Sequence, residues 1–261
     1  MPPATLPAST VEPDGSTVVR LLSYNVRSLR QDTAALARVI RACAPDVVCV
    51  QEAPRFFRWR KHAARLARSV GLTHVTGGAT TTGPMILAAL RAHVEQSADL
   101  LLPRTPGLHR RGLATAVLRF GSATRLGVVS CHLSLQAEER YAQAGLVRQH
   151  TAALDAPHAV LAGDLNESPS GRSFGHLAGT FVDAYVAAPW GTAETFSAHR
   201  PERRIDAVLT TPDVRVLGCG VPRGLPGVTD ADLRAASDHL PVLAVVRIPG
   251  PQAHAPARRE G

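Results

Sequence analysis

The sequence predicts an α/β fold in which mixed β-sheets pack together and carry helices on their outer faces. Three observations support this expectation. Short runs rich in β-branched residues alternate with a few amphipathic helical patterns, the predicted strands outnumber the helices roughly two to one, and the chain opens in the order β-α-β-α. The 261 residues are enough for one sizeable core, and 45% hydrophobic with 19% charged residues is typical of a folded globular domain.

The first four elements follow one another within residues 17–71. A strand over 17–26 leads to Asp32, which can cap a helix. A buried strand over 46–52 comes next, and a second helix ends at Gly71. Both helices have apolar residues at offsets 0, 3, 4 and 7: Leu36, Val39, Ile40 and Cys43 in the first, and Ala63, Leu66, Ala67 and Val70 in the second.

Strands dominate the rest of the chain. We expect them within 84–90, 93–102, 113–120, 125–134, 158–166, 203–211, 214–221 and 238–248. One more helix, with Ala144, Val147, Thr151 and Leu154 on one face, precedes the strand in 158–166. With no internal repeat and no long linker, residues 17–249 are expected to form one domain. The ends, 1–16 and 250–261, are rich in Pro, Ala and charge and are expected to be unstructured.

Net charge and cysteine content give limited information about the partners and the cellular compartment of the protein. A net charge of +8 fits a surface that binds polyanions, but only Lys61 among the 29 basic residues is a lysine, a bias that an Arg-rich genome explains equally well. No apolar run is long enough to span a membrane and no export signal is evident, so we expect a cytoplasmic protein. The scattered cysteines, Cys43, Cys49, Cys131 and Cys219, are expected to be reduced and buried.

Acids, amides and histidines interrupt the apolar strands near their ends. These residues are Asn25, Glu52, His132, Asp164, Asn166, Asp206, Asp238 and His239. A carboxylate among so many apolar residues loses hydration and needs a cation, a donor or a proton, so several of them from distant segments imply a shared site. Taken singly, each could also be structural, as a turn amide, a solvated loop acid, a member of an ion pair or a core histidine.

The residue types at these positions indicate the chemistry of the site. Carboxylate and amide oxygens, without a thiolate cluster or a His-x-x-x-His spacing, favour a hard cation such as Mg²⁺ or Mn²⁺ over structural zinc. Such an ion neutralises a phosphoryl oxygen, an aspartate can orient or deprotonate water, and histidines can handle protons or phosphate charge. The expected protein is therefore a metal-dependent phosphoesterase.

The same residues resemble the endonuclease/exonuclease/phosphatase superfamily, which includes deoxyribonuclease I. The resemblance covers nearly all of residues 17–249. It rests on six segments in order: "SYNV" with Asn25, "VVCVQE" with Glu52, "VVSCHLS" with His132, "LAGDLNESP" with Asp164 and Asn166, "RRIDAVL" with Asp206, and "SDHLPV" with Asp238 and His239. It implies a four-layered α/β sandwich of two packed mixed β-sheets flanked by helices, with the functional loops at one edge.

The resemblance also implies a role for each residue. Glu52 would ligate the divalent ion, with Asn25 and Asp238 lining the same metal pocket. Asp164 would orient and activate water. Asn166 and His132 would contact the scissile phosphate. His239 would stabilise charge on that phosphate, its ring held by Asp206. "HRRG" (109–112) resembles a segment that approaches the phosphate in several relatives, which makes Arg111 a candidate substrate contact, although a solvated basic turn explains it equally.

Two departures from the family pattern bear on mechanism and substrate. Some abasic-site nucleases have a carboxylate two residues after the first asparagine, where this chain has Arg27, which argues against a two-ion mechanism and an abasic-site enzyme. "TGPMILAAL" (82–90) replaces a more polar segment, so one substrate contact is expected to be lost.

The function we expect is hydrolysis of a phosphodiester, as in a nuclease, with Mg²⁺ or Mn²⁺ and water activated by Asp164. The alternative is a phosphatase or phospholipid phosphodiesterase acting on a small phosphorylated molecule or a lipid headgroup. The expected partner is a phosphoester substrate, with nucleic acid among the candidates, and no obligate protein partner is evident.

Two other classes of function compete with a phosphoesterase. "GRSFG" (171–175) matches the Gly-x-Ser-x-Gly motif of serine hydrolases around Ser173, but the segment 167–170 separates it from the preceding strand. A non-catalytic nucleic-acid-binding module would use the positive charge and leave the carboxylates without a role.

Overall fold

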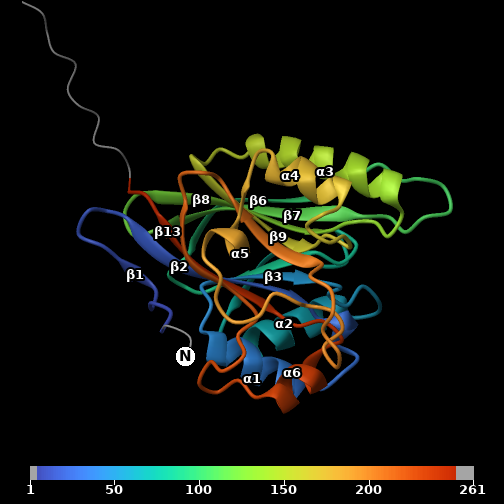
Figure 1. The fold of residues 1–261 in the computed structure, drawn as a ribbon, viewed down its shortest axis with the longest axis horizontal. Coiled ribbons are helices and arrows are strands. Elements are labelled where there is room, and N and C mark those ends of the chain that lie inside the picture. The colour runs from blue at the N-terminus through green and yellow to red at the C-terminus, as the bar shows by residue number, and fades with distance from the viewer. Residues whose placement is uncertain (1–4, 251–261) are drawn as a thin grey trace, which may run out of the picture.

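The computed structural model describes residues 5–250, and within them two β-sheets pack face to face (Figure 1). The seven-stranded sheet has the order β12 (Arg215–Gly220), β13 (Val242–Ile248), β2 (Thr17–Asn25), β3 (Val47–Gln51), β5 (Met85–Ala88) and β4 (Thr73–Gly77), with β1 (Thr10–Val11) paired to β2. The six-stranded sheet has the order β10 (Val182–Asp183), β11 (Asp206–Thr210), β9 (His158–Asp164), β8 (Thr124–His132), β7 (Gly112–Phe120) and β6 (His93–Leu101). Both sheets are mixed, because β2–β3 and β8–β9 are parallel and their other neighbours antiparallel.

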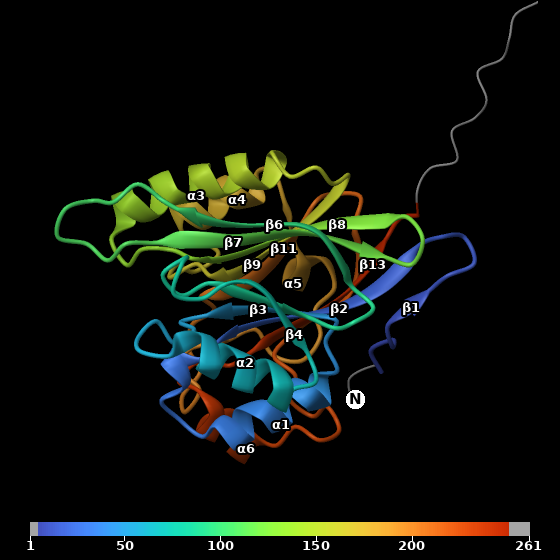
Figure 2. The same ribbon diagram turned by 180° about the vertical axis from the view of Figure 1, so that it is seen from behind.

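Helices cover both outer faces of this pair of sheets. Helices α1 (Thr33–Cys43), α2 (Trp59–Ser69) and α6 (Asp230–Ala236) lie on the first sheet, and α3 (Ala137–Ala152) and α4 (Arg172–Ala178) lie on the second (Figures 1 and 2). The short helix α5 (Ala184–Ala187) and the 3₁₀ helix η1 (Arg27–Leu29) belong to connections. The predicted four-layered α/β sandwich is therefore confirmed. No helix within residues 5–250 has the length and apolar character needed to cross a bilayer.

The predicted N-cap and the predicted apolar faces of α1 and α2 explain how these helices pack on the first sheet. Asp32 is the N-cap of α1, and its Oδ1 accepts hydrogen bonds from the backbone N–H groups of Ala34 and Ala35 at 2.8 and 3.0 Å. The apolar stripes of α1 and α2 are buried in one cluster with the outer face of the first sheet. All four cysteines are buried and unpaired, as expected.

Strand β2 is buried on both faces, which explains its nearly continuous apolar sequence. Val19 and Leu21 face the second sheet, whereas Leu22 and Tyr24 face the helices, since successive side chains of a strand point to opposite sides. Two apolar layers therefore meet at β2, which lies beside β3 in the interior of its sheet.

Leu21→Ala should lower the free energy of unfolding by about 2–5 kcal/mol, because Leu21 is fully buried between the sheets and its removal leaves a cavity. Leu90→Ala is the matched control, since Leu90 is 88% exposed, and its effect should stay within about 0.5 kcal/mol. Urea unfolding of the three proteins measures both changes. Equal stability of the two variants would contradict the placement of Leu21.

The N-terminal segment differs from the expectation that residues 1–16 are unstructured. Thr10 and Val11 form β1 against β2, Leu6 is buried in the core beneath the helices, and the Arg20 guanidinium donates a hydrogen bond to the Pro7 carbonyl at 3.0 Å. The Pro- and Ala-rich composition of this segment did not predict these contacts, because only a few of its residues make them. Residues 1–4, and 251–261 of the expected C-terminal tail, lie outside the described residues.

Three of the longer elements, β4, α4 and α6, are not among those predicted. The two helices have seven residues each, about two turns, which is too short for a helical period to stand out. In strand β4 the first three residues are exposed or half-exposed and the last two are buried. The strand therefore lacks the apolar pattern of its neighbours.

Candidate functional site

The predicted site residues come together at one edge of the sandwich. The parallel strands β2 and β3 end there with Asn25 and with Glu52, which directly follows β3. The parallel strands β8 and β9 of the other sheet end there with His132 and Asp164, which are register partners. Parallel strands necessarily bring their carboxyl ends to the same edge, so four distant positions meet.

Two further segments reach this edge in the opposite direction. Strand β11 is antiparallel to β9, and its first residue, Asp206, pairs with Asp164. Strand β13 is antiparallel to β2 and is preceded by Asp238 and His239. These three residues therefore lie where strands begin, while the other strands end beside them.

A cavity of about 400 Å³ opens at this edge. Seven of the nine predicted site residues line it: Glu52, Arg111, His132, Asp164, Asn166, Asp238 and His239. The other two, Asn25 and Asp206, are buried directly behind these side chains and hold them by hydrogen bonds.

Asp164 is at the centre of the site. Its Oδ2 accepts a hydrogen bond from Asn25 Nδ2 at 3.0 Å and lies 3.4 Å from His132 Nε2 and 3.7 Å from His239 Nε2. Its Oδ1 accepts from the backbone N–H of Asn166 at 2.9 Å. Burial raises the pKa of the Asp164 carboxyl, and the nearby Asp206 carboxylate raises it further. A carboxylate with a raised pKa is better suited to accept a proton.

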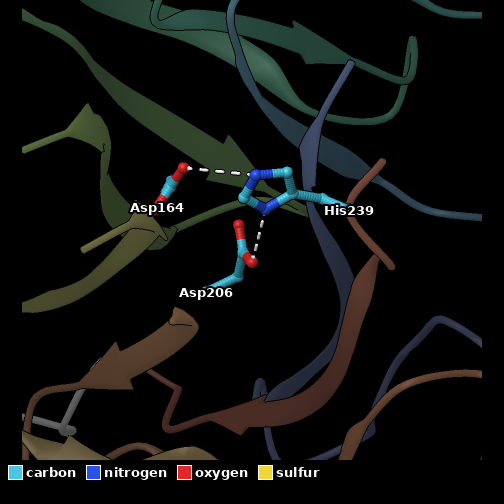
Figure 3. A group of neighbouring side chains, drawn as sticks. All are labelled: Asp164, Asp206 and His239. Atoms are coloured by element: carbon cyan, nitrogen blue, oxygen red, sulfur yellow. Dashed lines mark hydrogen bonds and ion pairs between the residues drawn. The ribbon is translucent and has the colours of Figure 1, made fainter. Parts of the chain in front are cut away.

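The His239 ring lies between two carboxylates, as Figure 3 shows. Its Nδ1 donates to Asp206 Oδ2 at 2.9 Å, the pairing expected from the sequence, and its Nε2 faces Asp164. Burial by itself lowers the pKa of His239, but the Asp206 carboxylate and its hydrogen bond outweigh this and raise the pKa to about 9. The ring is therefore an imidazolium at neutral pH.

Residues before and beside β11 hold this pair in place. Thr195 Oγ1 accepts from the backbone N–H groups of Ile205 and Asp206 at 3.1 and 3.2 Å, and the Phe196 ring packs 4.8 Å from the His239 ring. Neither residue was predicted, because a threonine and a phenylalanine in a loop carry no sequence signal of their own.

The second histidine has the opposite protonation state. Burial lowers the pKa of His132 to about 4, and the positive charges of Arg111 and His239 outweigh part of the attraction of Asp164. His132 is neutral at pH 7 and can donate a single hydrogen bond from Nε2 or accept one there, depending on the tautomer.

The Glu52 side of the cavity suits a hard cation. Glu52 has a left-handed backbone conformation (φ 51°), and its Oε1 accepts from Asn25 Nδ2 at 3.1 Å. Asp238 lines the same cavity. Carboxylate oxygens without a thiolate are the donors that Mg²⁺ and Mn²⁺ prefer, so the residues present fit such an ion.

Arg27 and Asn25 modify this donor set. Arg27 Nε lies 3.3 Å from Asp238 Oδ2, so the guanidinium partly neutralises Asp238. The Asn25 side-chain oxygen accepts from the Arg27 backbone N–H at 3.1 Å, while its NH₂ group contacts Glu52 and Asp164. In this arrangement Asn25 orients the two carboxylates.

Among the described residues, Asp164, Asp206 and His239 form the group with metal-ligand spacing, their ligand atoms lying within 4.8 Å of one another. An imidazolium has no free lone pair for a metal. The raised pKa of His239 therefore favours a hydrogen-bonded charge cluster at these three residues.

Arg111 lies in the cavity as predicted, and its Nε is buried without a hydrogen-bond partner among the described residues. Burial lowers the pKa of its guanidinium, while Asp164 and Glu52 oppose that change. A buried donor without a partner costs free energy unless a ligand supplies an acceptor, which an anionic group in the cavity would do.

Two more arginines, Arg55 and Arg203, line the cavity and were not predicted as site residues. The Arg203 guanidinium lies over the Phe196 ring at 4.9 Å, and the neighbouring Arg204 pairs with Asp183. Ser173 is inside helix α4 and does not line the cavity, so a serine hydrolase would have no nucleophile there.

Comparison with known proteins shows what this chain is similar to. The model of the endonuclease/exonuclease/phosphatase family matches residues 22–239. Similar solved structures include an endonuclease/exonuclease/phosphatase from Beutenbergia cavernae (26% identity, TM-score 0.69, 90% of this chain and 73% of that one). A mannosyl-6-phosphatase from Bacteroides thetaiotaomicron (19%, 0.70, 87% and 99%) and truncated Caenorhabditis elegans TDP2 (19%, 0.66, 88% and 97%) are also similar. No curated protein matches the chain.

Proposed function

The chain belongs to the endonuclease/exonuclease/phosphatase family, whose members are hydrolases of phosphoester bonds, and on this premise we propose that it is a divalent-metal-dependent phosphodiesterase. One observation carries the proposal: buried Asp164 joins the carboxylate side of the cavity, through Asn25, to the two histidines on its other side. A general base, a cationic donor and a candidate cation site thus surround one small cavity.

The side chains divide the reaction between them. Asp164 orients a water molecule and takes its proton as the water oxygen bonds to phosphorus, while the bond from phosphorus to the ester oxygen breaks and the alcohol or phenol leaves. The His239 imidazolium and the Arg111 guanidinium donate hydrogen bonds to phosphoryl oxygens, where negative charge grows in the transition state. Asp206 keeps His239 protonated, and Asn166 and His132 position the phosphate from the β8 and β9 side.

Glu52 and Asp238 would hold a Mg²⁺ or Mn²⁺ ion, with Asn25 orienting Glu52. Such an ion, when bound, supplies positive charge that neutralises a phosphoryl oxygen. The Arg27–Asp238 ion pair supports one ion rather than two, because the guanidinium already offsets part of the negative charge that a second ion would need.

Glu52→Gln should weaken binding of Mn²⁺ by about tenfold or more, because the change removes the negative charge of a ligand and keeps its shape. Calorimetric titration of Mn²⁺ into both proteins measures the difference. Glu138→Gln, an exposed acid on α3, is the matched control and should bind like the wild type. Equal affinity of all three proteins would remove Glu52 from the cation site.

A diester is the substrate that the cavity supports best. Arg55, Arg111 and Arg203 all line it, which is more positive charge than a single phosphate needs and fits a substrate with flanking phosphate or acidic groups. The fold is shared with a mannosyl-6-phosphatase, and a cavity of about 400 Å³ also admits a small monoester, so a phosphatase is the second candidate.

A screen of the purified protein with Mn²⁺ tests the proposal. The substrates are plasmid DNA, an abasic oligonucleotide, bis-p-nitrophenyl phosphate, p-nitrophenyl phosphate and sphingomyelin. We expect turnover of diesters, loss of turnover with EDTA, and resistance to a serine-directed fluorophosphonate. Hydrolysis of the monoester alone would favour the phosphatase, and inertness toward all five substrates would contradict the proposal.

The cytoplasm is the compartment that we propose for this enzyme. The four unpaired cysteines support it, because free thiols persist where glutathione and thioredoxin keep them reduced.

A further inference from the structure

A strongly basic and aromatic segment follows the active-site residue Glu52. Between residues 53 and 94 the sequence has no Asp or Glu and contains seven cationic residues: Arg55, Arg58, Arg60, Lys61, Arg65, Arg68 and Arg91. Phe56, Phe57 and Trp59 lie among the first four of them. The first six cationic side chains are exposed, and none forms an ion pair with another residue of the described range. Their charge is therefore available to a partner.

The side chains of two phenylalanines in this segment, Phe56 and Phe57, are largely exposed to solvent. Phe56 is 68% and Phe57 84% exposed, on the loop that joins β3 to α2 at the active-site edge (Figures 1 and 2). The apolar face of α2 is not available, because Ala63, Leu66 and Ala67 are buried against the first sheet. The loop tip is thus an exposed apolar element, with the Arg58 guanidinium 5.2 Å from the centre of the Phe57 ring, at the start of a helix whose exposed face is cationic.

The hollows around this segment connect it to the rest of the basic surface. One hollow contains Phe56, Phe57, Leu29 and His62, and a groove of about 600 Å³ between α1 and α2 shares Leu29 and His62 with it. That groove also contains Arg41 and Arg65, together with Arg38, whose guanidinium forms an ion pair with Asp232. On the other side, Arg55 precedes Phe56 and lines the active-site cavity. One continuous cationic surface with an apolar tip therefore borders the active site.

A third exposed apolar side chain lies on the rim of the active-site cavity. Leu135 is 74% exposed, lines the cavity and follows β8 at the same edge of the sandwich. An aliphatic side chain has no π-face on which a nucleic-acid base could stack, but it can enter the acyl boundary of a bilayer as phenylalanine does. Leu135 therefore favours a lipid surface over a nucleic acid as the partner.

We propose that Phe56, Phe57 and the exposed basic face of α2 dock the protein on a bilayer containing anionic phospholipid. The phenylalanine rings enter the boundary between headgroups and acyl chains, and Arg60, Lys61, Arg65 and Arg68 contact the anionic headgroups. This docking places the mouth of the active-site cavity beside the lipid surface. The inference concerns where the protein binds and does not rest on the proposed reaction.

Sedimentation with vesicles tests the docking surface. Vesicles of phosphatidylcholine alone are compared with vesicles that also contain phosphatidylglycerol. The wild type should sediment with the anionic vesicles at low ionic strength, and sedimentation should fall as salt screens the headgroups. The double variant Phe56→Ser/Phe57→Ser should bind at least about tenfold more weakly, because two inserted rings are lost.

Matched variants separate docking from unspecific effects. Leu90→Ser changes a residue that is 88% exposed, following β5 at the opposite edge of the sheet, and should leave binding unchanged. Lys61→Glu/Arg65→Glu should abolish binding, whereas Arg148→Glu on α3 should only weaken it slightly. Thermal unfolding confirms that each variant is folded.

Three results would overturn the proposal. The wild type could stay in the supernatant with anionic vesicles, or the Phe56→Ser/Phe57→Ser variant could sediment as well as Leu90→Ser. The third is binding of a single-stranded oligonucleotide that depends on Phe56 and Phe57 without binding of vesicles, which would assign the surface to nucleic acid.

Discussion

Asp164→Asn should lower kcat for a diester by about 10²-fold or more while the protein stays folded, because the amide keeps the shape of the carboxyl but cannot accept the proton of the attacking water. Steady-state hydrolysis of bis-p-nitrophenyl phosphate with Mn²⁺ measures the loss. Asp213→Asn is the matched control, since Asp213 pairs with His158 at the opposite end of the same strand, β9. Near-wild-type turnover of Asp164→Asn would remove Asp164 from the reaction.

The same variant separates a catalytic from a structural role. The pKa of Asp164 is raised in the folded state, mainly by burial, so the ionised carboxylate opposes folding at neutral pH. Removing that charge should leave the melting temperature unchanged or raise it. A residue retained for stability would behave in the opposite way, with a lower melting temperature accompanying the loss of rate.

Asp206→Asn should also lower the rate at pH 8 by about 10²-fold, through the protonation state of His239. The Asp206 carboxylate raises the pKa of His239 to about 9 against the effect of burial. Without that carboxylate the largest effect opposing burial is lost, and only the weaker effects of Asp164 and Asp238 still raise the pKa, so the pKa of His239 falls and the ring loses its proton more readily at pH 8. The alkaline limb of the kcat/KM profile should therefore move from near pH 9 to lower pH.

Asp183→Asn is the control for this shift. Asp183 is an acid of the adjacent strand β10 and pairs with Arg204, away from the His239 ring. Its replacement should leave the alkaline limb where it is in the wild type. An Asp206→Asn profile that loses rate equally at every pH would contradict the role assigned to the Asp206–His239 pair.

The sequence predicted most of the fold because the apolar pattern is strong in its central elements. Strands β2, β3 and β9 are buried on both faces and have nearly unbroken apolar sequences, while α1 and α2 carry clear stripes and a cap or a glycine at their ends. The location of the site also followed, since a buried strand rarely ends in a carboxylate or a histidine for the sake of packing alone. That these residues lie close together in space depends on the order of the strands in the sheets, and the sequence of a single segment does not reveal that order.

Other features of the site could not be predicted from the sequence. The opposite pKa shifts of His132 and His239 depend on which carboxylate each ring contacts, and both histidines lie beside similar apolar runs. The Arg27–Asp238 ion pair joins residues more than 200 positions apart, and Phe196 contacts His239 from a loop without a motif. The exposure of Phe56 and Phe57 was likewise hidden, because an aromatic pair before an amphipathic helix more commonly packs beneath it.

The central claim is that water, activated at Asp164, attacks the phosphorus of a bound ester. Hydrolysis of bis-p-nitrophenyl phosphate in water enriched in ¹⁸O, followed by mass spectrometry of the products, tests it most directly. We predict one ¹⁸O atom in the p-nitrophenyl phosphate produced and none in the p-nitrophenol, with the yield of both products from Asp164→Asn lower by about 10²-fold or more. Label in the phenol, or equal product from Asp164→Asn and the wild type, would contradict it.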